Sequence, residues 1–403
     1  MPYWILGMGP TKSQSPSRLR PNPIPSTMPR AMPDVLLVSK PIAPPWHDSS
    51  KNLVRDLASH LQRYTPVLMS RRDTTLDIPR ARVEPVYPAL ATDSGFAPAL
   101  QDNARVLKRL LLGSKAELWH FFFAPNPKTS TVARWSARAR RMRTVQTVCS
   151  APAQHVNLRR VLFAERVVVL SEHTLRRFVA AGISEQRIAL IRPAIAPLTP
   201  ASADSARDLR LQLGLPSDRP VVVYAGDLEF GRGADLALEA HADLPKSLGA
   251  ELIMACRAKT PRARARASEL RARVDALGIA ESVRFLGETP RIHALLSVAD
   301  LVTLPTDSLY AKMDLPLVLI EAMSLARPVL VGTGTPAQEL AAGGGALAVP
   351  TQRDAVSTAT RALLEDATQR AALGARARQV VLREYSPENM AARYETLYDE
   401  LCA

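Results

Sequence analysis

The sequence has few aromatic residues, few cysteines and no long apolar run. Aromatic residues make up 5% of the 403 residues, whereas apolar residues make up 47%, so the cores must consist mainly of Leu, Val, Ile and Ala. Cys149, Cys256 and Cys402 are far apart and show no metal-ligand spacing. This spacing argues against a zinc or disulfide framework and favours a cytoplasmic location. No apolar run approaches the ~20 residues of a membrane span.

Acidic residues are also scarce, and the formal net charge is +14. Such an excess predicts anionic partners, although an Arg-rich and Ala-rich codon bias would explain part of it. A nucleic-acid partner is not expected, because the arginines lie on scattered predicted helices without interleaved stacking aromatics. Nucleotide diphosphates and anionic lipid remain as candidate partners.

No acid occurs between Leu118 and Ala164, and the predicted helix Thr131–Arg143 lies inside this stretch. Arg134, Arg138 and Arg141 share one face of that helix, at i, i+4 and i+7. The helix could contact an anionic membrane peripherally, at its inner face. The alternative is a solvated basic helix that covers a sheet and buries Trp135 in the core.

The chain is long enough for two domains, and its strand–helix rhythm predicts two doubly wound α/β domains. Residues 1–33 contain many prolines and no acid, and they lack the apolar core of a signal peptide. We expect a disordered tail there, or sequence upstream of a start at Met28 or Met32. The rhythm starts at Asp34, pauses in the Pro-, Ala- and Ser-rich stretch 196–219, and then resumes. This pattern predicts domains at 34–197 and 198–385.

The stretch 300–340 predicts a strand, a polar loop, a helix and a second strand. Pro316 suits the first turn of the helix 317–326, and Glu321 is the only ionisable residue inside that helix. The free N–H groups of Leu317 and Val318 would point back at the loop, which predicts a phosphate site at the strand ends.

Two segments of this stretch resemble the donor-site motif of retaining GT-B glycosyltransferases of family 4. Glu321-Ala322-Met323 and Arg327-Pro328-Val329-Leu330 match its second half, and the first Glu of the motif falls on Met313. The resemblance extends from about Asp34 to the C-terminus. It implies a GT-B architecture of two Rossmann-like domains, whose last helix, 386–403, returns to the first domain.

The loop after the predicted strand 221–224 resembles a family loop in which two cations hold the donor diphosphate. The resemblance implies that Gly226, Arg232 and Gly233 bind the diphosphate, whereas Asp227 replaces the other cation. The alternative for this loop is a flexible turn with one solvated arginine. The second predicted domain also contains a helix, 263–277, whose arginines are expected to be solvated.

Other positions match the family less closely. Leu286 and Gly287 resemble a segment whose backbone meets the nucleotide base, and His120 resembles a strand-end histidine. Cys149 stands where a histidine is common. Asp48 and Ser49 replace a Gly pair near the donor phosphates, and helix capping explains them equally well.

The resemblance implies transfer of a hexose from a nucleoside diphosphate sugar to an acceptor hydroxyl, with retention, in polysaccharide or glycoconjugate biosynthesis. Arg232 and Lys312 would stabilise the leaving diphosphate. Asp314 would contact the sugar, and Glu321 would accept from the ribose hydroxyls. The acceptor would be a carbohydrate or lipid-linked. No Asp-x-Asp motif follows a strand, so neither a divalent metal nor a cofactor is expected.

Two rival functions of the same fold can be weighed against this reaction, and only the first fits the residues. The departures at Asp227, Met313, Cys149 and 48–50 are compatible with an inactive GT-B scaffold that binds a nucleotide or a partner. An epimerase or phosphorylase of the same fold would need its own catalytic carboxylate or cofactor-lysine pattern, and none is found.

Overall fold

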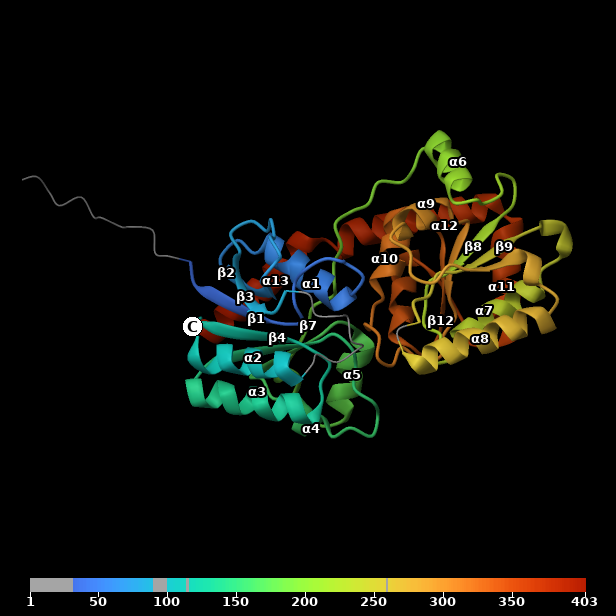
Figure 1. The fold of residues 1–403 in the computed structure, drawn as a ribbon. Coiled ribbons are helices and arrows are strands. Elements are labelled where there is room, and N and C mark those ends of the chain that lie inside the picture. The colour runs from blue at the N-terminus through green and yellow to red at the C-terminus, as the bar shows by residue number, and fades with distance from the viewer. Residues whose placement is uncertain (1–31, 90–99, 114–115, 259) are drawn as a thin grey trace, which may run out of the picture. The chain divides into compact units, whose positions relative to one another are not determined.

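Two parallel β-sheets with flanking helices make up the computed structural model (Figure 1). The structure describes residues 32–89, 100–113, 116–258 and 260–403. The predicted tail and its alternative start sites therefore lie, apart from Met32 and Pro33, outside the described residues. The predicted class of two doubly wound α/β units is confirmed.

The first sheet has seven strands in the order β3-β2-β1-β4-β5-β6-β7, all parallel. The direction in which successive strands are added to the sheet reverses between β1 and β4, which are hydrogen-bonded neighbours. The strands are β1 (Asp34–Val38), β2 (Thr65–Arg71), β3 (Arg82–Tyr87), β4 (Leu118–Phe122), β5 (Arg143–Val148), β6 (Arg166–Val169) and β7 (Ile188–Leu190).

Both faces of the first sheet are buried. Val35 and Leu37 of β1 belong to one apolar cluster, and Leu36 and Val38 belong to another. Because successive side chains of a strand point to opposite faces, β1 feeds two separate cores. Such two-sided burial explains why the central strands read as continuous apolar runs.

The second sheet has six strands in the order β10-β9-β8-β11-β12-β13, again all parallel. Here the direction of winding reverses between β8 and β11. In open α/β sheets, ligands bind at the carboxyl ends of strands at such a reversal. The strands are β8 (Val221–Tyr224), β9 (Glu251–Met254), β10 (Val283–Phe285), β11 (Leu301–Leu304), β12 (Val329–Gly332) and β13 (Leu347–Val349).

Helices follow most strands. In the first half they are α1 (Ser49–His60), α2 (Leu100–Leu112), α3 (Pro127–Arg140), α4 (Leu158–Val161), α5 (Glu172–Ala180) and the 3₁₀ helix η1 (Glu185–Arg187). From the linker onward they are α6 (Ala203–Gln212), α7 (Gly233–Ala242), α8 (Pro261–Ala276), α9 (Ile292–Val298), α10 (Leu317–Ser324), α11 (Arg353–Glu365), α12 (Ala367–Glu384) and α13 (Pro387–Cys402), with η2 (Lys246–Leu248), η3 (Ala280–Ser282) and η4 (Pro336–Gly344). None of the described helices combines the length and the apolar character needed to cross a bilayer.

The C-terminal helix α13 packs against the first sheet. The Tyr398 hydroxyl lies 2.6 Å from His120 Nδ1, and the Tyr394 hydroxyl lies 3.0 Å from Thr147 Oγ1. Glu395 accepts hydrogen bonds from two backbone N–H groups that follow α1. The chain therefore returns to its first sheet after completing the second, although the predicted boundaries at 197 and 385 stay predictions.

Two elements differ from the sequence-based expectation. Strand β3 was not predicted, because it carries charged residues and Pro85, which suit only the sheet edge that it occupies. The helical pattern of residues 354–382 predicts one continuous helix, whereas the structure interrupts it at Asp366, whose side chain accepts from the Gln369 N–H at 2.8 Å and starts a new helix.

Candidate functional site

The loops after β8 and β11 meet at the carboxyl edge of the second sheet. Between them they carry most of the residues predicted to bind the diphosphate. Three contacts join the loops: Lys312 Nζ lies 2.5 Å from Asp227 Oδ2, the Phe230 and Tyr310 rings pack edge to face at 5.2 Å, and the Arg232 N–H donates to Asp307 Oδ1 at 2.8 Å.

Glycine is required where these loops approach one another. Gly231 has φ +86°, and a Cβ there would lie 2.7 Å from Thr306 Oγ1. A Cβ on Gly226 would lie 2.5 Å from the Tyr224 hydroxyl, and one on Gly233 would lie 2.9 Å from the same atom. The predicted glycines are therefore explained by close backbone packing at the strand ends.

Asp227 organises the loop after β8, although the sequence suggested only a lost cation. Its Oδ1 accepts from the N–H groups of Glu229 and Phe230 at 2.6 and 2.7 Å, and the Tyr224 hydroxyl donates to its carbonyl. Its other carboxylate oxygen is therefore directed at Lys312. An ammonium from the second loop thus lies beside the position from which the family's arginine is missing.

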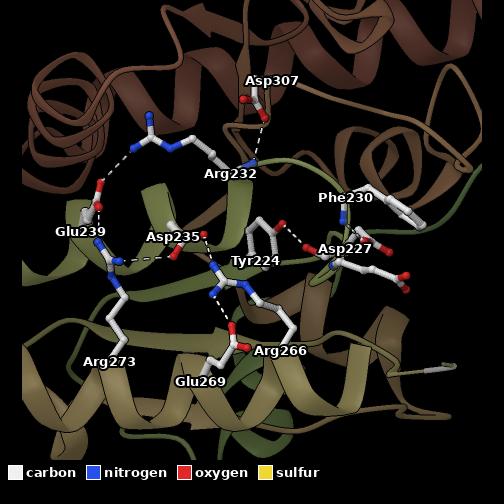
Figure 2. A network of polar contacts seen from close by, with 11 residues as sticks. Tyr224, Asp227, Phe230, Arg232, Asp235, Glu239, Arg266, Glu269, Arg273 and Asp307 are labelled. Atoms are coloured by element: carbon white, nitrogen blue, oxygen red, sulfur yellow. Dashed lines mark hydrogen bonds and ion pairs between the residues drawn. The ribbon is translucent and has the colours of Figure 1, made fainter. Parts of the chain in front are cut away.

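Arg232 is the most exposed of the predicted site residues. Its side chain is 59% exposed and runs towards Glu239, away from Asp227 and Phe230 (Figure 2). Its guanidinium lies 4.0 Å from a Glu239 carboxylate oxygen. An exposed pair at that distance is worth little, so a phosphate could readily draw this arginine away.

The arginines of α8 are not all solvated, which corrects one expectation. Arg266 bonds to Asp235 at 2.5 Å, and Arg273 bonds to both Asp235 and Glu239 (Figure 2). Both carboxylates sit on α7 and are buried. Since a buried carboxylate needs a partner, these arginines pair α8 with α7 beneath the loop.

Two helices begin at this edge without a side-chain cap. The N-cap residue of α7 is Arg232 and that of α10 is Pro316, and neither supplies a capping hydrogen bond. The first-turn N–H groups of a helix, including those of Leu317 and Val318, have no intrahelical acceptor. Together with Lys312, they form an arrangement suited to an anion.

The structure places Lys312-Met313-Asp314 differently from the prediction. Met313 is 6% exposed and belongs to the core, and Asp314 is 1% exposed. Asp314 Oδ2 accepts from the Ser171 hydroxyl at 2.8 Å, ahead of α5. Burial raises the pKa of Asp314, and hydrogen bonds from Thr174 and Ser171 oppose that shift. We therefore correct the predicted sugar contact: this carboxylate is already engaged by the first half of the chain.

Glu321 is half-buried, and its Oε2 lies 3.4 Å from His293 Nε2. The hydrogen bond to Glu321 raises the pKa of His293. Ribose binding by Glu321 stays a prediction. The same holds for the base contact of Leu286 and Gly287, where Leu286 is 43% exposed and the space around Gly287 is open.

His120 is a core residue, which corrects its candidacy as a catalyst. It is fully buried, and its two ring nitrogens contact Tyr398 and Thr147 at 2.6 and 2.7 Å. Burial holds its pKa well below the usual value, so the imidazole is neutral. Cys149 is 5% exposed, and burial raises the pKa of its thiol to about 12.

Asp48 and Ser49 lie at the start of α1, after the loop that follows β1 of the first sheet. Asp48 Oδ1 accepts from the Ser50 N–H at 2.9 Å, and Oδ2 lies 2.7 Å from Lys40 Nζ. Burial opposes ionisation, but Lys40 and Ser50 outweigh it and lower the Asp48 pKa to about 2. Helix capping accounts for Asp48, whereas a ligand contact of Ser49 stays a prediction.

In the described residues no cluster of three or more His, Cys, Asp or Glu side chains is arranged for a metal, and a metal-free reaction stays a prediction.

Comparison with known proteins finds a family match for the part of the chain that contains these loops. The family model of glycosyl transferases group 1 matches residues 205–380. A D-inositol 3-phosphate glycosyltransferase of Corynebacterium urealyticum is 30% identical over 223 residues, which cover 53% of this chain and 51% of the relative. A GDP-mannose-dependent alpha-(1-6)-phosphatidylinositol monomannoside mannosyltransferase of Mycolicibacterium smegmatis is 25% identical, over 85% of this chain and 94% of the relative.

Solved structures agree with the fold. Anabaena HepE in complex with UDP-glucose superimposes with a TM-score of 0.74 at 19% identity, covering 91% of this chain and all of HepE. The chain spans about half the length of the C. urealyticum relative and 64% of a second curated one. The residues that match the family model, 205–380, contain the loops after β8 and β11, and the solved structures show that the chain has the GT-B fold.

Proposed function

We propose that this chain is a cytoplasmic, retaining hexosyltransferase that uses a nucleoside diphosphate sugar. The observation that carries the proposal is the pair of uncapped helices, α7 and α10, at the reversal point of the second sheet, with Lys312 between the loops. A diphosphate supplies two adjacent anionic groups, which matches two helix N-termini and nearby cations.

The relatives support the donor class and a glycoconjugate acceptor. One is named for GDP-mannose and a phosphatidylinositol mannoside, and HepE binds UDP-glucose. We infer a sugar donor of this class and a carbohydrate or lipid-linked acceptor hydroxyl. Retention at the anomeric carbon rests on the family resemblance.

The chemical step calls for stabilisation of the leaving diphosphate rather than for a strong base. Lys312 and the first-turn N–H groups of α10 would receive the developing charge. Arg232 would leave Glu239 and close on the diphosphate from the exposed side. Glu321 would accept from the ribose, and Asp314 would hold the Lys312 loop in position through Ser171.

The competing proposal is a scaffold that binds nucleotide without transferring sugar. It is favoured by Met313, which occupies the place of the family's first carboxylate and is packed into the core. In such a scaffold, the diphosphate site would work and the sugar site would not.

Titration calorimetry with UDP and GDP tests the site. Arg232→Ala should weaken binding by about 1.5–3 kcal/mol, the usual worth of a hydrogen bond to a charged group. Arg264→Ala, which changes an exposed arginine on α8, is the matched control and should leave the affinity unchanged. Equal affinities for wild type and Arg232→Ala would remove Arg232 from the site.

Release of diphosphate from UDP-glucose and GDP-mannose separates the two proposals. A transferase should release UDP or GDP from one donor slowly, by hydrolysis, without acceptor, and faster, by transfer of the sugar to the acceptor hydroxyl, when an acceptor is present. Wild-type protein that binds UDP or GDP but releases neither from any sugar donor would be a scaffold.

A further inference from the structure

A second basic feature lies on the first half of the chain, at the end of α3. A surface hollow of about 380 Å³ is lined by four arginines, Arg134, Arg138, Arg141 and Arg143, together with Met142 and Phe163. One carboxylate, Glu165, also lines it, so four positive charges face one negative charge. The hollow therefore combines an apolar lining with net positive charge.

Two of these arginines are not used by the fold. Arg138 and Arg141 are exposed, and neither guanidinium makes a hydrogen bond or ion pair with any residue that the structure describes. Their neighbour Arg140, by contrast, donates to the carbonyls of Leu111 and Gly113 at the end of α2. Arginines near the C-terminus of a helix can also interact favourably with the helix dipole. That role alone would not require a hollow beside Arg138 and Arg141.

Large apolar side chains are exposed next to these charges. Trp135, one turn before Arg138, is 59% exposed, which overturns the alternative in which it is buried in the core. Val132 on the same helix is 44% exposed, and Leu112 at the end of the neighbouring α2 is 75% exposed. Indole rings beside arginines are characteristic of surfaces that meet phospholipid headgroups.

The hollow is separate from the proposed donor site. It lies where β5 begins, at Arg143 and Thr144, whereas the donor loops follow the carboxyl ends of β8 and β11. Changes at this surface can therefore be tested while nucleotide binding serves as a control.

We propose that the α3 surface, defined as Trp135, Arg138, Arg141 and the adjoining hollow, docks on a leaflet of anionic phospholipid. A lipid phosphate enters the hollow between the guanidinium groups, which bind phosphate in a bidentate manner. Trp135 then lies at the depth of the headgroups. The proposal does not depend on which sugar the chain transfers.

Co-sedimentation of the full chain with phosphatidylcholine vesicles, with and without phosphatidylglycerol, tests the proposal. Wild-type protein should bind only the anionic vesicles. The double variant Arg138→Gln/Arg141→Gln should lose about 5-fold in partitioning for each arginine, or roughly 25-fold together. The matched variant Arg262→Gln/Arg264→Gln, on α8, should lose far less. Both variants should keep wild-type affinity for UDP or GDP.

A second variant tests the aromatic residue. In wild type, tryptophan emission should shift to the blue on anionic vesicles, and Trp135→Phe should abolish most of that shift. Equal losses from the α3 and α8 double variants, or equal binding to neutral vesicles, would overturn the proposal. The proposal would also be overturned if the α3 double variant lost binding to a single-stranded oligonucleotide but still bound anionic vesicles, because the surface would then serve a nucleic acid.

Discussion

The two sheets treat the helices at their reversal points differently. In the first sheet, α1 and α3 begin at Asp48 and Asn126, whose side chains accept from first-turn N–H groups at 2.9 and 3.0 Å. In the second sheet, α7 and α10 begin at Arg232 and Pro316 without a capping side chain. One sheet satisfies its helix ends internally, and the other leaves them available to an anion.

Lys40 and Arg232 follow the same division, although Lys312 beside the second sheet is paired with Asp227 at 2.5 Å. Lys40 in the first sheet is neutralised by Asp48 at 2.7 Å, and this carboxylate also caps α1. Arg232 in the second sheet has only a carboxylate at 4.0 Å and is mostly exposed. The same strand order around the reversal point can thus accompany capped helix ends in one half of a molecule and uncapped ones in the other.

The largest expected difference between the two regions is the effect of mild acid on stability, because His241 beside the second sheet titrates there and Asp48 beside the first sheet does not. His241 on α7 is 7% exposed, and burial lowers its pKa to about 4 from the usual 6.5. As the pH falls, His241 is protonated in the unfolded chain before it is protonated in the folded one. Its contribution to the free energy of unfolding is therefore fully present above pH 6.5 and is lost as the pH drops towards 4. This loss from His241 alone should reach about 3 kcal/mol.

Urea unfolding between pH 7 and pH 4 measures that loss. His241→Gln should make the profile shallower in this window, because the glutamine side chain does not titrate, whereas the buried imidazole of His120 keeps its own contribution. Asp48, with a pKa near 2, contributes stability that persists until the pH falls below its unfolded value. Asp48→Asn should therefore leave the slope between pH 7 and pH 5 unchanged. A wild-type slope retained by His241→Gln would contradict the assignment.

Removal of the cap in the first sheet should affect stability alone. Asp48→Ala deletes the α1 cap and the partner of Lys40, and it should cost about 1–2 kcal/mol of unfolding free energy. UDP and GDP affinity should not change, because this end is already satisfied. Calorimetry that shows a matching loss of nucleotide affinity would restore Asp48 to the donor site.

A cap introduced into the second sheet should compete with the ligand. Pro316 has φ −61° and ψ 119°, an extended geometry in which an aspartate can cap. Pro316→Asp should place a carboxylate over the first turn of α10 and weaken UDP and GDP binding by about 1 kcal/mol. Pro316→Ala, which lacks the capping group, should bind nearly as wild type. Unchanged binding by Pro316→Asp would mean that this helix end does not meet the phosphates.

Much of this organisation could be predicted from the sequence. Continuous apolar runs predicted the central strands, because both faces of a parallel sheet are buried. Gly226 and Gly233 marked the loop after β8 as a candidate diphosphate site, and Pro316 marked the start of α10. These signals are local, so a single sequence contains them.

The partners of charged side chains could not be predicted, because they depend on contacts distant in the chain. Asp314 was expected to face a sugar, but it meets Ser171, which lies 143 residues away. In the sequence, Asp227 only marked the place where the family has a second cation. In the structure it pairs with the ammonium of Lys312, which lies 85 positions further along the chain. His120 looked available only because its partner Tyr398 comes from the last helix.

The most direct test of a diphosphate site at the second sheet uses the Asp227–Lys312 pair. UDP and GDP affinities would be measured by calorimetry for wild type, Lys312→Gln and Asp227→Asn. Lys312→Gln removes a cation and should weaken binding by at least tenfold. Asp227→Asn keeps the oxygen that accepts from Glu229 and Phe230 but removes a negative charge, so it should tighten binding several-fold. Changes of opposite sign are the predicted result, and two unchanged affinities would contradict the account.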